Sequence, residues 1–273
     1  MEITPKAVNV IVGHYGVGKT NFALNWAYDL ASRGVHVTLV DFDVVNPYFR
    51  SSDYARDLEN AGVNLIAPVL AGSSLDTPSI SGAVTTAIES AYCAFEEAEG
   101  ALKAEVEAEA EEAEGVPSSL ASANNANAKT ANDVPSQVVI IDAGGDDVGA
   151  TVLGRFSEDI AKGEYQMLYV VNKYRNLTQD VESALAIKDE IEKASHLFVT
   201  GVVNNSHLRT ETDEQTITNA FEFGRECANA IGVPLVCTTA SQYLLEQKNE
   251  GVIQLMSREK IYPVRMIVRT PWE

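Results

Sequence analysis

One stretch decides the fold: Gly13-His14-Tyr15-Gly16-Val17-Gly18-Lys19-Thr20, which fits the phosphate-loop pattern G-x-x-x-x-G-K-[ST] at every required position. Before it, residues 8–12 read Val-Asn-Val-Ile-Val, a short β-branched run that predicts a buried strand. After it, residues 21–33 carry apolar side chains at helical spacing, which predicts a helix. A strand, a loop and a helix in this order are the context in which the pattern binds the phosphates of a nucleotide.

The residue types of this loop suit a triphosphate and a magnesium ion. Glycines tolerate positive φ and carry no Cβ, so backbone N–H groups can turn toward a phosphate at the start of the helix. Lys19 adds a positive charge at the β- and γ-phosphates, which also makes it a candidate catalytic residue, and the Thr20 hydroxyl is a ligand for Mg²⁺. We expect the nucleotide to bind Gly13, Gly16, Val17, Gly18, Lys19, Thr20 and Asn21.

Two more predicted strands end in carboxylates. Residues 35–40 lead into Asp41-Phe42-Asp43, and residues 137–141 lead into Asp142, which is the Walker B pattern. Ligands of open α/β sheets bind at the carboxyl ends of the strands. Asp43 is therefore the candidate for orienting an attacking water, with Asp41 and Asp146 as the alternatives. The predicted metal ligands are Thr20, Asp43 and Asp142.

The remaining chain alternates between apolar runs and helical patterns, which predicts an α/β fold with a mostly parallel sheet flanked by helices on both faces. We interpret residues 1–273 as one nucleotide-binding domain, interrupted by an acidic, partly disordered insertion at about residues 97–135. Residues 96–114 hold nine Glu and one Lys, a net charge of −8, without an apolar stripe. The other predicted elements are strands 63–66, 166–171, 197–203 and 233–237, and helices 52–61, 78–95, 178–194 and 214–231.

Composition excludes several classes of function. The 273 residues carry a formal charge of −19, which disfavours a protein that binds nucleic acid over a broad surface. Cys93, Cys227 and Cys237 lack C-x-x-C spacing, which argues against a disulfide framework, a zinc site and a self-contained iron–sulfur ligand set. No apolar run approaches the roughly 20 residues of a membrane span, and no secretory signal is visible, so the expected location is the cytoplasm.

Together these stretches resemble the MinD/ParA/CobQ group of P-loop NTPases over about residues 8–240. The resemblance implies ATP and Mg²⁺ as ligands. It also implies that Asp-Phe-Asp is a switch I sequence, whose second acid, Asp43, orients the water, and that Gly144-Gly145 lie in switch II. In this group an asparagine that closes a later strand hydrogen-bonds adenine. Asn205 is our choice for that role, and Asn204 is the alternative.

Two positions depart from known patterns. His14 stands where the group has a lysine that crosses a homodimer to the partner's phosphates, and a neutral imidazole does not reliably supply that charge. A homodimer around the nucleotide therefore stays an open expectation. Residues 172–175, Asn-Lys-Tyr-Arg, resemble the guanine-reading N-K-x-D, but Arg175 replaces the aspartate that accepts from guanine. This replacement weakens the case for guanine specificity.

Three functions follow from these patterns. The leading interpretation is a Mg²⁺-dependent ATPase that couples hydrolysis to a conformational change or to an unidentified protein partner. The second is an ATP-dependent ligase or kinase, similar to dethiobiotin synthetase, which acts on a small-molecule acceptor near residues 46–50. The third is a non-catalytic nucleotide-binding module. The sequence alone leaves all three open.

Overall fold

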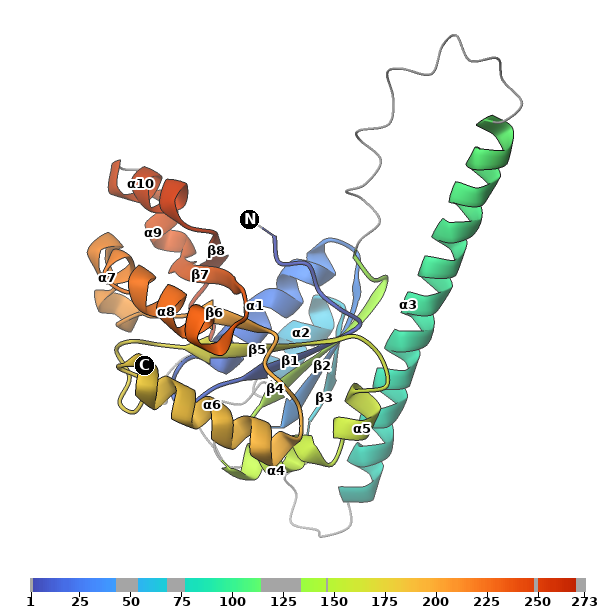
Figure 1. The fold of residues 1–273 in the computed structure, drawn as a ribbon, viewed down its shortest axis with the longest axis horizontal. Helices are drawn as coiled ribbons and strands as arrows, with labels where there is room; N and C mark the ends of the chain where they lie inside the picture. Colours follow the sequence, from blue (N-terminus) through green and yellow to red (C-terminus); the bar gives the residue numbers. More distant parts are fainter. Residues whose placement is uncertain are drawn as a thin grey trace.

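A parallel sheet of eight strands forms the centre of the molecule (Figure 1). The computed structural model describes residues 2–42, 54–67, 77–113, 134–145, 147–247 and 250–268. The strand order is β3-β2-β4-β1-β5-β6-β7-β8, so β1 lies between β4 and β5. The strands are β1 (Val8–Val12), β2 (His36–Phe42), β3 (Val63–Ile66), β4 (Gln137–Ala143), β5 (Tyr165–Val171), β6 (Gly201–Asn204), β7 (Leu235–Ser241) and β8 (Ile261–Val264).

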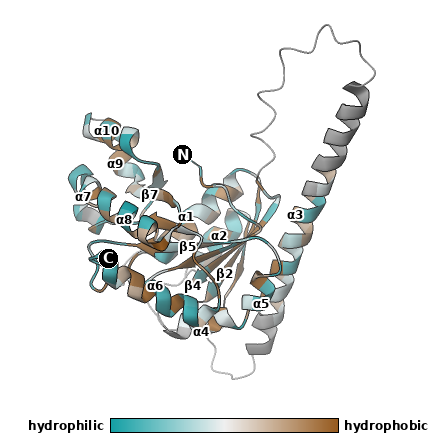
Figure 2. Ribbon diagram, viewed as in Figure 1, coloured by the Kyte–Doolittle hydropathy of each residue, from teal (hydrophilic) through white to brown (hydrophobic). Residues whose placement is uncertain are grey.

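Helices cover both faces of this sheet, because the central strands are apolar on both sides. In β4, Val139 and Ile141 join one buried cluster, while Val138 and Ile140 join the other. The strands are hydrophobic, and the helices turn hydrophilic residues outward (Figure 2). The helices are α1 (Lys19–Ser32), α2 (Ala55–Asn60), α3 (Thr77–Ala113), α4 (Asp147–Gly154), α5 (Ser157–Ile160), α6 (Val181–Ser195), α7 (Glu214–Thr218), α8 (Phe221–Ile231), α9 (Gln242–Glu246) and α10 (Glu250–Arg258), with a 3₁₀ turn η2 (Arg209–Glu211).

The predicted fold class, a parallel sheet between two helical layers, is confirmed by this arrangement. In a parallel sheet the carboxyl ends of all strands lie on the same side of the sheet, where ligands bind. The loop after β1 therefore lies beside the ends of β4 and β5. Within the described residues no helix is both long and apolar enough to cross a membrane.

Helix α3 is 37 residues long and continues the predicted helix at 78–95 into the Glu-rich run. Its packing against the sheet comes from an early stretch, where Val84, Ile88 and Ala91 are buried. The Tyr92 hydroxyl donates a hydrogen bond to the Ile160 carbonyl (2.6 Å). The later turns of α3 project beyond the sheet (Figure 1). The rest of the predicted insertion, residues 114–133, lies outside the described part of the chain.

The predicted strand at 197–203 is wrong in its first half, because β6 begins only at Gly201. The Thr200 N–H donates to the Met167 carbonyl (2.9 Å), but the Met167 N–H donates to the Thr200 hydroxyl (2.9 Å). The Val199 N–H likewise donates to the Glu192 carboxylate (2.9 Å). Side-chain acceptors here replace the backbone ladder that defines a strand.

The last part of the chain also differs from the prediction. Strand β8 was not predicted, because Pro263 within it reads as a break. In the structure β8 pairs with β7 at the edge of the sheet, where a proline costs no ladder bond on the outer side. The predicted helix 214–231 is two helices, α7 and α8, which end and begin around Asn219-Ala220.

Candidate nucleotide-binding site

The phosphate loop joins β1 to α1 and holds its glycines in conformations that other residues rarely adopt. Gly13, Gly16 and Gly18 have φ of 148°, 77° and 93°. A Cβ on Gly13 would collide with the Val170 carbonyl of β5, and one on Gly18 would collide with the Asn205 amide. Positive φ and lack of space thus both require glycine at these two positions.

The Lys19 side chain folds back over the phosphate loop, of which it is itself a part. The side chain is 6% exposed, and its ammonium donates to the His14 carbonyl at 3.2 Å. Gly145, just after β4, packs against the same place: a Cβ built on it would lie 2.7 Å from Lys19 Nζ and 2.6 Å from the Tyr15 nitrogen. The loop after β4 therefore touches the phosphate loop at the lysine that is predicted to hold the γ-phosphate.

Two buried carboxylates lie at the ends of β2 and β4. Asp41 and Asp142 are register partners in neighbouring strands, and Asp142 is also the partner of Ile11 in β1. Their exposed fractions are 2% and 1%, and that of Thr20 is 8%. These oxygen donors suit Mg²⁺, which binds through one or two carboxylates, waters and substrate phosphates rather than an all-protein cage. The described residues contain no group of three or more His, Cys, Asp or Glu that could hold a metal.

Asp43, the predicted water-orienting residue, lies outside the described residues, which stop at Phe42 and resume at Tyr54. Its role stays a prediction. Asp41, one of the alternatives, is described and is buried beside Asp142. Two carboxylates that are buried side by side repel each other, and a bound cation relieves that repulsion. The burial of Asp41 therefore favours a role at the metal over the interpretation that it simply ends a strand in solvent.

The two asparagines after β6 have different surroundings. Asn205 donates from its amide nitrogen to the Val17 carbonyl in the phosphate loop (2.7 Å), and its amide oxygen accepts from the Thr239 hydroxyl. Asn204 instead donates to the Ala220 carbonyl at 3.0 Å, inside the protein. The structure thus places Asn205 at the loop and Asn204 in the core.

A cavity of ≈ 320 Å³ lies beside Asn205, at the ends of β6 and β7. Polar residues from the neighbouring segments line it, along with the apolar side chains of Ile217, Leu244 and Val264. Sequence reasoning did not find most of this lining, because the residues lie far from any motif. The polar ones include Asn21, His207, Arg209, Thr212, Thr239 and Ser241.

His207 is uncharged at neutral pH. Burial, with the positive charges of Arg175 and Arg209, lowers the pKa of His207 to about 4. Its Nδ1 accepts a hydrogen bond from the Arg209 N–H (3.1 Å), so the single proton of the ring belongs on Nε2. A Cβ on Gly18 would lie 3.4 Å from that Nε2. The imidazole N–H therefore lies next to the phosphate loop.

Asn21, the predicted nucleotide contact at the start of α1, uses its side chain elsewhere. Its amide donates to the Arg265 carbonyl (3.0 Å) and accepts from the Ile267 and Val268 N–H groups (2.9 and 3.2 Å). Asn25 also bonds both backbone groups of Arg265. The group that Asn21 can offer a phosphate is its backbone N–H, at the N-terminus of α1.

His14, at the position of the signature lysine, is partly exposed. Its Nδ1 lies 3.1 Å from the carbonyl of its neighbour Tyr15, and Tyr15 itself is 51% exposed. The tip of the loop thus faces away from the core.

Comparison with solved structures finds chains of low sequence identity. FtsY from Mycoplasma mycoides is 15% identical, with a TM-score of 0.47 and 88% of this chain covered. The signal recognition particle 54 kDa protein from Aeropyrum pernix K1, in complex with GDP, is 16% identical (TM-score 0.48, 87% covered). FtsY from Elizabethkingia anophelis, also with GDP, is 17% identical (TM-score 0.46, 94% covered). This chain spans 61%, 42% and 65% of those three chains.

No protein of curated function matches the sequence. Residues 10–218, which include the phosphate loop, β4 and Asn205, match the family described as the CobQ/CobB/MinD/ParA nucleotide binding domain. This match covers most of the chain and agrees with the loop geometry and the parallel sheet. The chain therefore belongs to the CobQ/CobB/MinD/ParA nucleotide-binding domain family.

Proposed function

We propose that this chain is a Mg²⁺-dependent ATPase in which hydrolysis drives a conformational or partner switch. The observation that carries the proposal is the contact of Gly145 with Lys19 and Tyr15. A γ-phosphate bound at Lys19 needs room beside that ammonium, and the backbone of Gly145 lies there. Binding and loss of the γ-phosphate would thus move the loop after β4, which is the kind of order change that nucleotide switches use.

ATP rather than GTP is the proposed nucleotide. Guanine presents an N1–H and an amino group, which a carboxylate accepts well. Among the described residues that line the cavity there is no Asp or Glu, and Arg175 stands where a guanine reader has an aspartate. Adenine, with its N1 acceptor, fits a wall of amide, hydroxyl and imidazole donors better.

In this proposal Thr20 and Asp142 hold the Mg²⁺, directly or through its waters, and Asp43 positions the attacking water. The ion supplies charge neutralisation at the β- and γ-phosphates. Lys19 and the loop N–H groups bind and orient the triphosphate. A homodimer around the nucleotide belongs to the proposal only if it forms without the lysine that His14 replaces. Sedimentation with and without ATP would show whether it forms.

The first test removes the loop lysine. We expect Lys19→Ala to abolish tight Mg²⁺-ATP binding in calorimetry while the protein keeps its thermal unfolding transition, because the Lys19 ammonium donates to a carbonyl of the loop itself, that of His14. Lys162→Ala is the matched control, since Lys162 forms exposed ion pairs with Glu89 and Asp159 that contribute little. Equal ATP affinity in folded Lys19→Ala and the parent would refute the site, and tighter GTP than ATP binding by the parent would refute the base assignment.

One observation favours the ligase or kinase alternative. Arg209 lines the cavity with His207, and Arg175 lies near both, in a chain with a formal charge of −19. Positive charge at that place suits an anionic second substrate. Phosphate release from ATP alone supports the switch ATPase, whereas release that requires an added metabolite supports the alternative.

A further inference from the structure

Arg175, in the turn after β5, carries a guanidinium without a counter-ion in the described part of the chain. Its Nε is buried and has no hydrogen-bond partner there, and none of the described ion pairs includes it. Burial and the nearby positive charge of Arg209 both lower its pKa. Partial burial beside a like charge is unfavourable for a guanidinium, and a ligand of opposite charge would offset that cost.

The sheet topology brings Arg175 close to two residues that line the cavity, His207 and Arg209. β5 and β6 are neighbours, so the turn that holds Arg175 lies beside the segment that holds His207 and Arg209. The Asn172 side-chain amide donates a hydrogen bond to the His207 carbonyl (3.5 Å), which links the two segments. His207 and Arg209 thus line the cavity, and Arg175 lies close to both of them.

We propose that Arg175, Arg209 and His207 form an anion-binding subsite that takes a phosphate or carboxylate group other than the β- and γ-phosphates held at Lys19. His207 fits this role because its neutral ring presents Nε2–H next to Gly18, and an anion accepts from such a donor. The inference rests on the proposed function in one respect: the cavity is taken to hold the nucleoside.

Two ligands would supply this chemistry. One is a nucleotide with an extra phosphate on its ribose, and the other is a separate small anion, such as an acidic acceptor. Both place a negative group within reach of a guanidinium fork, which matches phosphate and carboxylate geometry. The experiment below separates them.

The direct probe is the arginine Nε–H signal in NMR spectra of the full chain, titrated with inorganic phosphate. The Lys19→Ala background reduces binding at the phosphate loop. We expect saturable shifts of the Arg175 and Arg209 signals, and at least about a 10-fold weaker phosphate affinity in Arg175→Gln, the scale of a charge-assisted hydrogen bond. Arg209→Gln serves as the second variant, and Arg175→Lys should recover part of the affinity.

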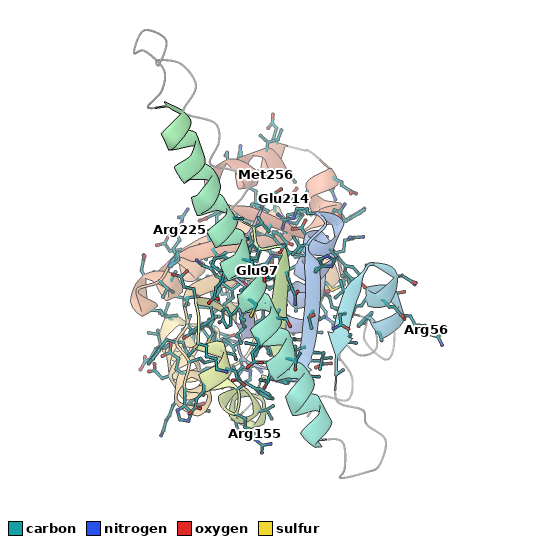
Figure 3. The ribbon with its side chains drawn as sticks, turned by 90° about the vertical axis from the view of Figure 1, so that its right-hand side faces the viewer. Arg56, Glu97, Arg155, Glu214, Arg225 and Met256 are labelled. Atoms are coloured by element: carbon teal, nitrogen blue, oxygen red, sulfur yellow. The ribbon has the colours of Figure 1, made fainter. Side chains whose placement is uncertain are left out.

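Arg155→Gln is the matched control, because it removes the same charge from an exposed arginine that points into solvent at the far end of the molecule (Figure 3). It should leave phosphate affinity unchanged. Thermal unfolding supplies a second readout: phosphate should raise the melting temperature of the parent but not of Arg175→Gln. In phosphate-free buffer Arg175→Gln should melt no lower than the parent, because it removes an uncompensated charge.

The two sources give different binding patterns. If adenosine 3′,5′-bisphosphate or its 2′,5′ isomer binds at least about 10-fold more tightly than AMP, and Arg175→Gln removes that gain, the anion belongs to the ribose. If phosphate binds alongside AMP, and the bisphosphates bind no more tightly than AMP, the anion is a separate molecule.

Three results bear on the subsite itself. It would be overturned if phosphate left the NMR signals of Arg175 and Arg209 unshifted, or if phosphate affinity were equal in Arg175→Gln and the parent. A marked loss of stability in Arg175→Gln without phosphate would overturn it too. Mg²⁺-ATP binding by the parent tests the proposed function separately.

Discussion

Gly145 is the residue through which β4 reaches the phosphate loop. With a side chain there, the Cβ would lie within 2.7 Å of both the Lys19 ammonium and the Tyr15 nitrogen, so either the loop or the strand end would have to move. The γ-phosphate binds beside a lysine in this kind of loop. Gly145 is therefore the first group on the Walker B side that a third phosphate would meet.

Asp43 and Asp142 should respond differently to the loss of charge. If Asp43 orients the water, Asp43→Asn keeps ATP affinity near that of the parent but slows single-turnover hydrolysis by roughly 10² or more, the usual scale for a positioned base. Asp142→Asn should weaken Mg²⁺ dependence and hydrolysis together, because its expected role is through the metal. Hydrolysis at the parent rate in Asp43→Asn would move the water-orienting role to Asp41, to Asp146 or outside this chain.

His207 should make stability depend on pH. Its pKa is about 4 in the folded protein, below the value near 6.5 of an unfolded chain. Between these two values the unfolded state binds more protons, so the contribution of His207 to the free energy of unfolding should fall as pH drops from about 6.5 to about 4, and this contribution should not change further below that. Urea unfolding across this range should show a shallower slope in His207→Gln. An identical slope in variant and parent would contradict the assignment.

Helix α1 serves two elements at once. Its N-terminus follows the phosphate loop, and its side chains Asn21 and Asn25 hydrogen-bond backbone groups of the segment after β8. Asn25 accepts from the Arg265 N–H (2.7 Å) and donates to the Arg265 carbonyl (2.9 Å). Val264 and Met266, on either side of Arg265, line the cavity. The end of the chain is thereby tied to the helix that carries the predicted phosphate site.

Loss of this tie should be measurable. Asn25→Ala leaves both backbone groups of Arg265 without that partner, so we expect a loss of about 1–3 kcal/mol in the free energy of unfolding. Ser32→Ala, at the exposed end of the same helix, should change it by less than about 0.5 kcal/mol. Urea unfolding measures both. Equal stability of Asn25→Ala and the parent would show that the segment after β8 holds without the asparagine.

Over the whole molecule, negative charge is concentrated away from the cavity. Residues 96–114 carry a net −8 of the total −19, and α3 carries most of this run beyond the sheet (Figure 1). The arginines of the proposed anion subsite lie at the carboxyl ends of β5 and β6 instead. The Glu-rich run of α3 and these two arginines thus lie in different parts of the molecule.

Deletion of about residues 97–135, with a short Gly/Ser bridge, should preserve both folding and ATP binding. The residues of α3 that are buried in the described part of this helix, Val84, Ile88 and Ala91, precede the deletion. Calorimetric unfolding and ATP titration of the shortened chain would check this. A drop of many degrees in melting temperature would mean that the arm packs on the domain.

The sequence by itself determined the strand–loop–helix unit, the alternation of strands and helices, and the acids at the ends of β2 and β4. These features depend on side-chain periodicity and on short motifs, which act between near neighbours in the chain. Tertiary structure alone decided the pairing of Asn205 with Val17, the contact of Gly145 with Lys19, and the meeting of Arg175 with Arg209. It also explains why a strand can contain Pro263: β8 lies at the edge of the sheet, where one side of the strand makes no ladder hydrogen bonds. Such contacts join residues far apart in sequence, and only the order of strands in the sheet sets which of them become neighbours.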